Sequence, residues 1–265
     1  PMLEIGPGSP TGIVFGTGAK FPARYQDALF ILDWTFGTIY ALHLEPNGAT
    51  YSATKEDFVW AKPLGVTDAI VGVDGALYFT VGGRGSQSAL YRVRYTGTDS
   101  TEPVATKPDA GSARLLRRSL EQFHGSVDPG ALRAAWPSLS HDDRFVRFAA
   151  RIAIENQPVG TWRDRALAEQ NTQASIMALI ALARQGTAAD LPGIVTALGR
   201  LPLTGISASQ RLGALRAYAI ALSRHSEASE IGDELREQIL SALDPLFPAA
   251  SDASATRRTS SLRGF

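Results

Sequence analysis

Hydrophobic and polar residues alternate along most of the first 97 positions, and this pattern predicts short β-strands joined by polar loops. The segments Gly75–Thr80 and Ala89–Tyr95 repeat a pattern already present at Ala28–Asp33 and Gly37–Leu44. Seven strands are expected: Gly12–Gly16, Ala28–Asp33, Gly37–Leu44, Phe58–Lys62, Thr67–Gly72, Ala76–Val81 and Ala89–Tyr95. Two short strands that face each other across a polar loop are typical of a β-propeller blade. The first four strands make one blade, and the last three begin another whose fourth strand is not obvious.

After residue 97 the pattern changes to Ala, Leu and Arg at helical spacing. In Asp142–Glu155 an acidic first turn precedes an apolar stripe of Phe145, Phe148, Ala149 and Ile152, which predicts a helix with that stripe in the core. Further helices are expected at Ala174–Arg184, Leu191–Leu201, Arg211–Arg224 and Glu230–Leu246.

Three tripeptides mark equivalent core positions of these helices: Ile152-Ala-Ile154, Ile180-Ala-Leu182 and Ile220-Ala-Leu222. The first two lie 28 residues apart and the last two 40 residues apart. HEAT repeats have a period of about 40 residues, so the shorter interval implies one short or missing helix. Stacked helix pairs of this kind usually provide a scaffold or a binding surface.

The predicted architecture is therefore an all-β partial propeller of about two blades followed by an all-α HEAT-like helical-repeat domain. The boundaries are residues 1–97 for the partial propeller and 98–109 for a linker rich in Pro and Thr. The helical repeats occupy residues 110–248, and residues 249–265 form a small, polar and flexible tail. A closed propeller needs about four to eight blades, so either the chain is a fragment of a larger protein or something else covers the open edges of its sheets.

Composition excludes several function classes. The 26 basic and 26 acidic side chains cancel, so no bulk field attracts nucleic acid. No cysteine is present, which excludes disulfides, thiolate metal sites and covalent c-type haem attachment within this chain. No apolar run is long enough to span a bilayer, and the start at Pro1-Met2-Leu3 carries no signal-peptide pattern.

Strand order predicts where a ligand would bind in the first domain. The loops Asp33–Gly37, Ala61–Thr67 and Gly82–Ser88 should gather on one rim, with Thr17–Asp27 at the opposite end. The rim then carries Asp33, Trp34, Phe36, Lys62, Asp68, Arg84 and Gln87. An aromatic platform beside charged and amide groups suits a sugar, whose C–H face stacks while its hydroxyls form hydrogen bonds.

A structural interpretation of the same residues is equally open. Trp34 and Phe36 then pack between blades, and Asp68 holds a turn. Arg84 lies between glycines in Gly82-Gly-Arg-Gly85, which would let the backbone approach a ligand, or it is a solvated loop residue. Asp74-Gly75 predicts a turn without chemistry.

The four histidines predict no metal site. His43 falls inside a predicted strand, and the other three lie near helix ends, where imidazoles commonly contact backbone groups: His124, His141 and His225. No phosphate-binding loop is expected either, because Gly82-Gly-Arg-Gly85 joins two strands and opens no helix.

The order of motifs in residues 9–95 resembles a known family. Ser9–Phe15, Phe21-Pro22, Ala28–Ile31, Gly37–Ile39 and Thr67–Tyr78 resemble the last blades of soluble quinoprotein glucose and sorbosone dehydrogenases. With the HEAT-like helices after them, the chain is similar to the large dehydrogenase-like, haem-binding proteins of planctomycete-type bacteria. That resemblance implies a periplasmic or otherwise extracytoplasmic location, and haem only where the full protein has a separate cytochrome domain.

In the quinoprotein family one Lys and two Arg anchor the acidic cofactor pyrroloquinoline quinone. This chain has Thr35, Gly65 and Thr67 at the matching positions. Each charge-assisted hydrogen bond contributes about 1.5–3 kcal/mol, so losing three cationic anchors costs a few decades in affinity. The sequence therefore predicts no cofactor-binding residues and no quinone in the familiar pose.

Two functional hypotheses remain open. In the first, the chain is part of an extracytoplasmic sugar or alcohol dehydrogenase-like propeller protein whose catalytic groups lie on other blades. In the second, it is a non-catalytic scaffold in which the propeller binds a glycan or the helical repeats bind a cytochrome domain or another protein. Neither hypothesis assigns a catalytic residue to this chain.

Overall fold

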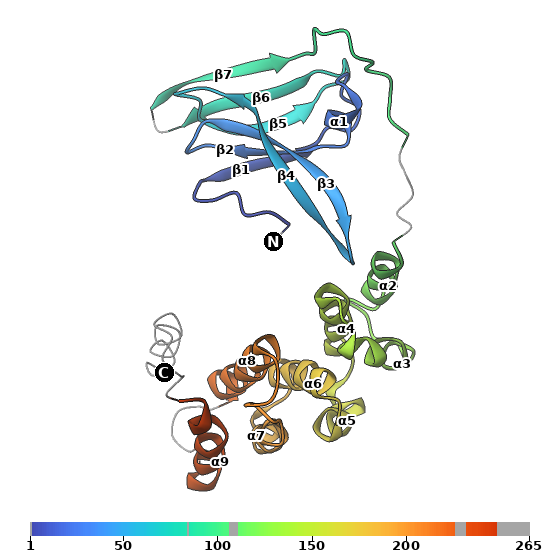
Figure 1. Cartoon of the computed structure of the whole chain (residues 1–265), viewed down its shortest axis with the longest axis vertical. Helices are drawn as coiled ribbons and strands as arrows, with labels where there is room; N and C mark the ends of the chain where they lie inside the picture. Colours follow the sequence, from blue (N-terminus) through green and yellow to red (C-terminus); the bar gives the residue numbers. More distant parts are fainter. Residues whose placement is uncertain (1, 84, 106–110, 226–231, 248–265) are drawn as a thin grey trace. The chain divides into compact units, whose positions relative to one another are not determined.

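A computed structural model describes residues 2–83, 85–105, 111–225 and 232–247 of the 265-residue chain. The chain divides into two compact units, Pro1–Gly111 and Ser112–Phe265 (Figure 1). The first unit is built from antiparallel strands and the second from helices. The order of a β region followed by an all-α region was predicted from the sequence and is confirmed.

The first unit contains two sheets. One has the order β1-β2-β3-β4 and the other β5-β6-β7, and every pairing is antiparallel. The strands are β1 Pro10–Phe15, β2 Leu29–Asp33, β3 Thr38–Asn47, β4 Thr50–Trp60, β5 Val66–Val71, β6 Leu77–Gly83 and β7 Ser86–Val93. The predicted division into four strands and then three is therefore confirmed.

The largest difference from the predicted strands is the β3–β4 hairpin. Strand β4 begins at Thr50, eight residues before the predicted start at Phe58, and β3 continues to Asn47. The two strands meet at a tight turn through Gly48, whose φ of +57° favours glycine. The loop Thr17–Asp27 also contains a short helix that the pattern did not predict, α1 Ala23–Gln26.

Both sheets contribute to one hydrophobic core. Phe30, Leu32 and Ile39 of the first sheet lie in the same buried cluster as Leu77 and Phe79 of the second. The shared core fixes the two sheets relative to each other, because separating them would expose these large side chains to water. Strand β1 also lies beside β5, where Thr11 Oγ1 donates to the carbonyl of Val66 (2.8 Å).

Part of the predicted linker belongs to the β unit. The buried amide of Gln26 donates to the carbonyls of Phe21 (2.8 Å) and Glu102 (2.9 Å) and accepts from the N–H of Val104 (3.0 Å). These bonds tie residues 101–104 to the loop that carries α1. The compact unit accordingly extends to Gly111 and includes residues that the sequence analysis assigned to a linker.

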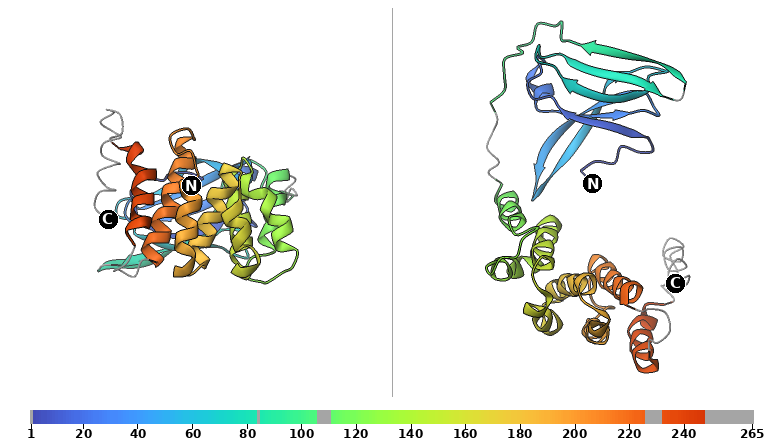
Figure 2. Two further views of the ribbon diagram at one scale, coloured as in Figure 1. Left: turned by 90° about the horizontal axis from the view of Figure 1, so that it is seen from below. Right: turned by 180° about the vertical axis from the view of Figure 1, so that it is seen from behind.

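The second unit is a double layer of helices (Figures 1 and 2). The α-helices are α2 Ser112–Glu121, α3 Ala131–Ala135, α4 Arg144–Glu155, α5 Arg163–Ala168, α6 Thr172–Gln185, α7 Leu191–Gly199, α8 Ala208–His225 and α9 Asp233–Leu243. Single 3₁₀ turns are η1 Trp136–Ser140, η2 Val159–Thr161, η3 Ala188–Asp190 and η4 Asp244–Leu246. In one layer α2, α4, α6 and α8 contact one another in order, and α3, α5, α7 and α9 form the other layer.

The five predicted helices correspond to α4, α6, α7, α8 and α9. The three short helices α2, α3 and α5 were not predicted. Helix α5 has only six residues, which agrees with the short helix implied by the 28-residue interval. The central alanines of the three predicted core tripeptides, Ala153, Ala181 and Ala221, are all fully buried on successive helices of one layer.

The predicted core face of α4 is wrong in part. Phe148 is 53% exposed, whereas Val146, Ala150 and Ala153 are fully buried. The small alanines allow α4 to pack closely against its neighbours, so the aromatic side of the helix faces outward. The helix starts at Arg144, two residues later than the first predicted position, since Asp143 is its N-cap and accepts from the N–H groups of Phe145 (2.7 Å) and Val146 (3.4 Å).

Two of the predicted helix-end histidines have structural contacts. His124 Nε2 lies 2.9 Å from the carbonyl oxygen of Ala149, and His141 Nδ1 accepts from the N–H of Asp143 (2.9 Å). His43 lies within β3, as expected, with Nε2 3.6 Å from Glu56. The tail 249–265 lies outside the described residues, as does the side chain of His225.

Candidate functional site

The three loops that were expected to form a rim do meet. Gly82 N–H donates to the carbonyl of Gly65 (2.9 Å), and Ala61 N–H donates to the carbonyl of Gly37 (3.1 Å). Trp34 Nε1 donates to the carbonyl of Gly82 (2.9 Å) and so joins the β2–β3 turn to the end of β6. The loop Thr17–Asp27 contacts the other end of the second sheet, where Lys20 N–H donates to the carbonyl of Gly75 (2.8 Å).

Asp33 is a buried structural carboxylate. Only 1% of its surface is exposed, and Oδ1 accepts from the backbone N–H groups of Ser9 (3.2 Å), Thr35 (2.9 Å) and Phe36 (3.2 Å). These three bonds hold the β2–β3 turn and the segment before β1. Because the Asp33 side chain is buried and Oδ1 is engaged by backbone donors, the carboxylate is not exposed to a ligand on the rim.

Trp34 also stabilises the junction between the two sheets. Its indole is half-buried, and a Cβ built on Gly65 would lie 2.8 Å from Nε1. Phe36 is 43% exposed, so it does not pack between the sheets to the extent that Trp34 does. The structural interpretation of Trp34 is supported by this packing, while Phe36 remains accessible.

The remaining rim candidates do not converge. Lys62 and Gln87 are exposed, Asp68 is exposed with Oδ1 accepting from the N–H of Ala69 (2.8 Å), and Arg84 lies outside the described residues. An open hollow of about 490 Å³ does lie nearby, between the ends of β5, β6 and β7. It is lined by Thr67, Thr80, Val81, Gly82, Gly83, Ser88, Ala89 and Leu90. None of the described rim candidates belongs to this lining.

The three residues at the positions that match the quinone anchors are in close contact with neighbouring side chains. Thr35 Oγ1 donates to Ser9 Oγ (2.8 Å), and Thr67 Oγ1 lies 2.8 Å from Thr80 Oγ1. Gly65 has no space for a side chain because the Trp34 indole fills it. A cationic side chain at position 65 would therefore require Trp34 to move.

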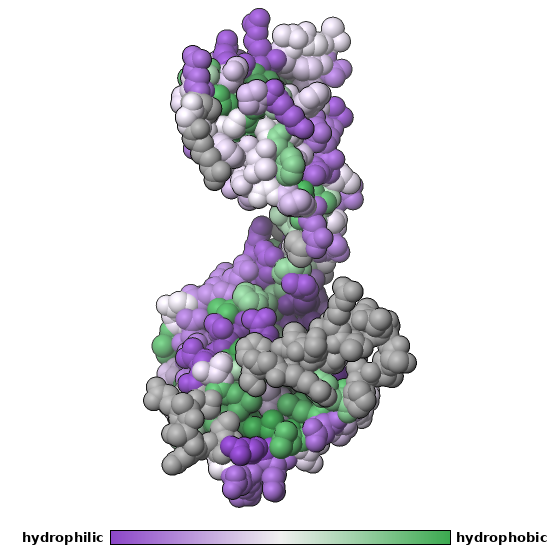
Figure 3. Space-filling model, turned by 90° about the vertical axis from the view of Figure 1, so that its left-hand side faces the viewer, coloured by the Kyte–Doolittle hydropathy of each residue, from purple (hydrophilic) through white to green (hydrophobic). Residues whose placement is uncertain are grey.

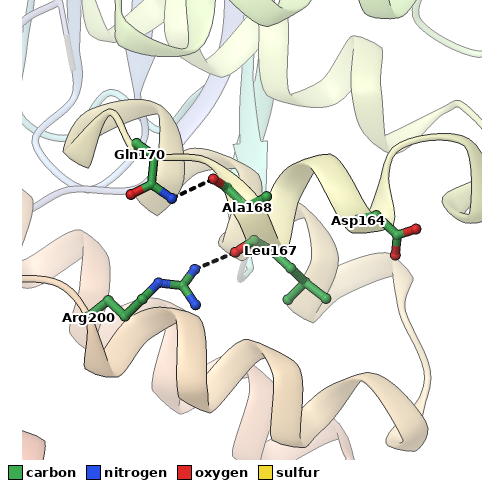
Figure 4. Close-up of a pocket in the computed structure, with 5 residues that line it drawn as sticks. All are labelled: Asp164, Leu167, Ala168, Gln170 and Arg200. Atoms are coloured by element: carbon green, nitrogen blue, oxygen red, sulfur yellow. Dashed lines mark hydrogen bonds between the residues drawn. The ribbon is translucent and has the colours of Figure 1, made fainter.

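A second hollow, of about 420 Å³, lies between α5 and α7 (Figure 4). Arg200 donates to the carbonyl of Leu167, and Gln170 Nε2 donates to the carbonyl of Ala168 (2.7 Å). Asp164 stands apart from both in the close-up. The polar side chains of this hollow thus hold the backbone of α5, and no pair of them converges on a ligand position.

The third hollow is the strongest candidate site. Helices α4, α6 and α8 of one layer enclose a groove of about 390 Å³, which we call the arginine groove. Its lining is Arg144, Phe145, Arg147, Phe148, Arg151, Gln173, Ile176, Met177, Ile180, Arg184, Ser209, Gly213 and Arg216. The floor is apolar and five arginines surround it. Figure 3 displays another aspect of the helical unit, in which hydrophobic surface is also bordered by hydrophilic residues.

A buried ion cluster holds part of this groove in place. Arg151 donates to Glu155 Oε1 one helical turn away, and Arg184 Nε from α6 lies 3.0 Å from Oε1 and 3.1 Å from Oε2 of the same carboxylate. The Glu155 side chain is only 4% exposed. Burial lowers the pKa of the Arg151 guanidinium, Glu155 raises it, and the charges of Arg184 and Arg216 lower it further. One carboxylate therefore serves several mutually repelling arginines.

Of the other three arginines, Arg147 is half-buried. Arg147 Nη1 donates to the carbonyls of His141 (2.5 Å) and Asp142 (2.8 Å), and burial lowers its pKa. Arg144 and Arg216 are exposed. The guanidinium carbon of Arg144 lies 4.9 Å from the ring centre of Phe145, and that of Arg151 lies 5.1 Å from the ring centre of Phe148. The aromatic rings of the groove therefore support the guanidinium groups.

No residue of the arginine groove was predicted as a site residue from the sequence, where Phe145, Phe148 and Ile180 were expected in the core. The predicted repeats nevertheless indicate these residues, because positions at the same distance before each core tripeptide line the same groove. The residue four positions before the first residue of each core tripeptide is Phe148, Ile176 or Arg216, and all three line the groove. The residue seven positions before it is Phe145, Gln173 or Gly213, and these also line it.

Comparisons with known protein families, with curated proteins and with solved structures find no match to this chain. Within the described ranges no helix combines the length and the hydropathy that a membrane span requires. Over the same part of the chain, no three His, Asp or Glu side chains gather where they could hold a metal ion.

Proposed function

We propose that this chain is a non-catalytic interaction protein whose helical unit binds a protein partner in the arginine groove. The observation that carries this proposal is the composition of the groove: an apolar floor built from three helices, surrounded by five arginines. Exposed apolar surface with a charged border is typical of protein-binding sites, in which arginine and aromatic residues are enriched.

We also propose that the two sheets are neighbouring blades of a propeller and that the helices are HEAT-type repeats. Support for the blades comes from the consecutive antiparallel strand order and from the first strands of the two sheets, β1 and β5, lying side by side. Support for the repeats comes from the two helix layers and from the short α5 in the short repeat interval. In this architecture the helices carry the binding surface.

The contacts of the rim residues favour a non-catalytic protein over a dehydrogenase. Asp33 and Trp34 are engaged in holding the turn and the sheet junction. At Gly65 the indole of Trp34 occupies the place that an anchoring side chain would need. A sugar-oxidising site would require these groups to be released from their structural contacts.

A displayed library of random 16-residue peptides, selected against the full chain, tests the proposed function. Phe148→Asp places a charge on the groove floor, and Leu240→Asp is its matched control because Leu240 is 50% exposed on α9 and does not line the groove. The expected result is a set of peptides that bind the wild type and the control at least tenfold more tightly than Phe148→Asp. Selected peptides that bind all three proteins equally, or a failure to select any, would contradict the proposal.

A further inference from the structure

The floor of the arginine groove offers anchoring positions for apolar side chains. Phe145 and Phe148 come from α4, and Ile176, Met177 and Ile180 come from α6. Gly213 completes the floor from α8, where a built Cβ would lie 2.8 Å from Ile176 Cγ2. Helices α6 and α8 thus approach closely at this glycine, and the polar side chains Gln173 and Ser209 line the groove beside the apolar ones.

The charged side chains that line the groove are all arginines, and the carboxylates of Asp142 and Asp143 lie near Arg147 but outside the lining. Five arginines line the groove, and the carboxylate that contacts them directly, Glu155, already accepts from two of them. Burial is the main cause of the lowered pKa of Arg151, and repulsion by the charges of Arg184 and Arg216 lowers it further. A ligand with carboxylates would relieve that repulsion, whereas a cationic ligand would increase it.

Arginine is suited to carboxylates more than lysine is. Its planar guanidinium forms bidentate hydrogen bonds with a carboxylate. Arg144 and Arg151 already lie over aromatic rings, which limits the conformations they can adopt before a ligand arrives. Less side-chain entropy is then lost on binding.

The backbone of the groove favours a helical ligand. All three walls are α-helices whose peptide groups are bonded within the helix, so an extended peptide would find few partners for its own N–H and C=O groups. A helical peptide satisfies these groups internally and presents only side chains. Packed helices lie about 8–10 Å apart, so the distance from α4 to α8 is about 16–20 Å and matches about three turns of helix.

A nucleic acid fits this surface less well than a peptide does. Phosphates would pair with the arginines, but Ile176, Met177 and Ile180 offer them no partner. A peptide helix with an apolar stripe and flanking carboxylates uses both the floor and its border. This is the helix-in-groove mode of recognition, with apolar anchors at i, i+3 or i+4, and i+7.

We infer that the arginine groove binds an acidic amphipathic helix of a partner protein. The apolar stripe of that helix packs on the groove floor, against Phe145 of α4 and Met177 of α6, and its carboxylates pair with the arginines. This inference rests on the proposed function and specifies its ligand. In this complex Arg216, which is exposed on α8, receives a carboxylate of the partner.

Three restricted pools of displayed 16-residue peptides test it against the full chain. In the acidic pool a helical stripe draws on Leu, Ile, Phe and Met, and the flanking positions draw on Asp and Glu. A basic pool replaces the acidic residues with Lys, and a third pool keeps the acidic composition but has Pro at two central positions. The expected result is at least tenfold enrichment of the acidic pool over both others.

Charge reversal locates the binding. Arg216→Glu should weaken the selected acidic peptides at least tenfold, while Arg236→Glu, an exposed arginine on α9 outside the groove, should leave them unchanged. Equal effects of the two variants would overturn the inference. Tighter binding of a 12-nucleotide single-stranded RNA, or self-association that Phe148→Asp abolishes in sedimentation, would also overturn it by identifying another occupant.

The two proposals fail in different ways. If random peptides bind in a Phe148-dependent manner but are neither acidic nor helical, the inference is wrong and the proposed function stands. If no peptide from any pool depends on Phe148, both are wrong. Dependence on Phe148 and Arg216 together, confined to acidic helical peptides, supports both.

Discussion

Replacing Glu155 with Gln is the sharpest test of how the helical unit holds its arginines. The change keeps the size of the side chain and removes its charge. Glu155 lies on α4, accepts from Arg151 of the same helix and from Arg184 of α6, and is 4% exposed. Glutamine can accept from one guanidinium but cannot neutralise two.

The expected loss of stability in Glu155→Gln follows from the burial of Arg151, whose side chain is 9% exposed. Removing one partner of a buried pair leaves an uncompensated charge and costs about 3–5 kcal/mol. Arg184 is 42% exposed and can recover part of its hydration, so a loss near the lower limit, about 3 kcal/mol, is expected. With a urea slope of about 2 kcal/mol/M, the unfolding midpoint falls by about 1.5 M.

The assay is urea unfolding followed by circular dichroism at 222 nm, where the helices of the second unit dominate the signal. The matched control is Glu121→Gln, because Glu121 pairs with Arg117 at 3.1 Å on α2 with the same spacing of four residues but is 42% exposed. An exposed pair contributes below about 1 kcal/mol. Arg151→Met combined with Glu155→Gln should recover most of the loss. If Glu155→Gln is no more destabilising than Glu121→Gln, the buried cluster does not hold α4 against α6.

Three other predictions concern single positions. Asp33→Ala leaves three backbone N–H groups without an acceptor and should lower the free energy of unfolding of the β unit by about 2–4 kcal/mol, measured by tryptophan fluorescence in urea, whereas Asp33→Asn should cost less. Gly65→Ala places a Cβ 2.8 Å from Trp34 Nε1 and should cost about 1–3 kcal/mol in thermal unfolding, while Gly160→Ala, with nothing within 4 Å, should have little effect. Tyr218→Phe removes a buried hydroxyl that has no partner among the described residues and should raise stability by about 1 kcal/mol. Burial raises the pKa of Tyr218 from 10.0 to about 12, so the unfolded state loses this proton first and wild-type stability should fall more steeply than that of Tyr218→Phe between pH 10 and 12.

In the β unit, alternation predicted strands wherever one face is buried. Strand β2, with four of its five residues buried, was placed within one residue. Strand β4 was largely missed because its first half, from Thr50 to Lys55, is partly exposed and carries little apolar alternation. The turn through Asn47-Gly48 was the available signal, since Gly48 adopts a positive φ.

In the helical unit, hydrophobic spacing identified five of the helices but only part of the face that α4 buries, since Ala149 is buried and Phe148 is exposed. Phe145 and Phe148 are more apolar than alanine, so the stripe containing them was assigned to the core. The structure instead buries the side of α4 that carries Val146 and Ala150, because small side chains let two helices approach each other closely. Periodicity reports that a stripe exists, and it cannot distinguish a core from a binding surface of the same composition.

The candidate site illustrates the same limit and a way around it. On the rim, residue types that suit a ligand proved to be engaged in turns, because Asp33 and Trp34 have the same hydrogen-bonding groups for either purpose. The arginine groove could not be found from one segment, since its walls are separated by 28 and 40 residues. The repeat register brings them together, because equivalent positions of successive repeats lie side by side in one layer. A Phe, an Ile and an Arg at equivalent positions do not form one uniform core stripe, and that mismatch in the sequence marks the layer face where Phe148 and Arg216 are exposed.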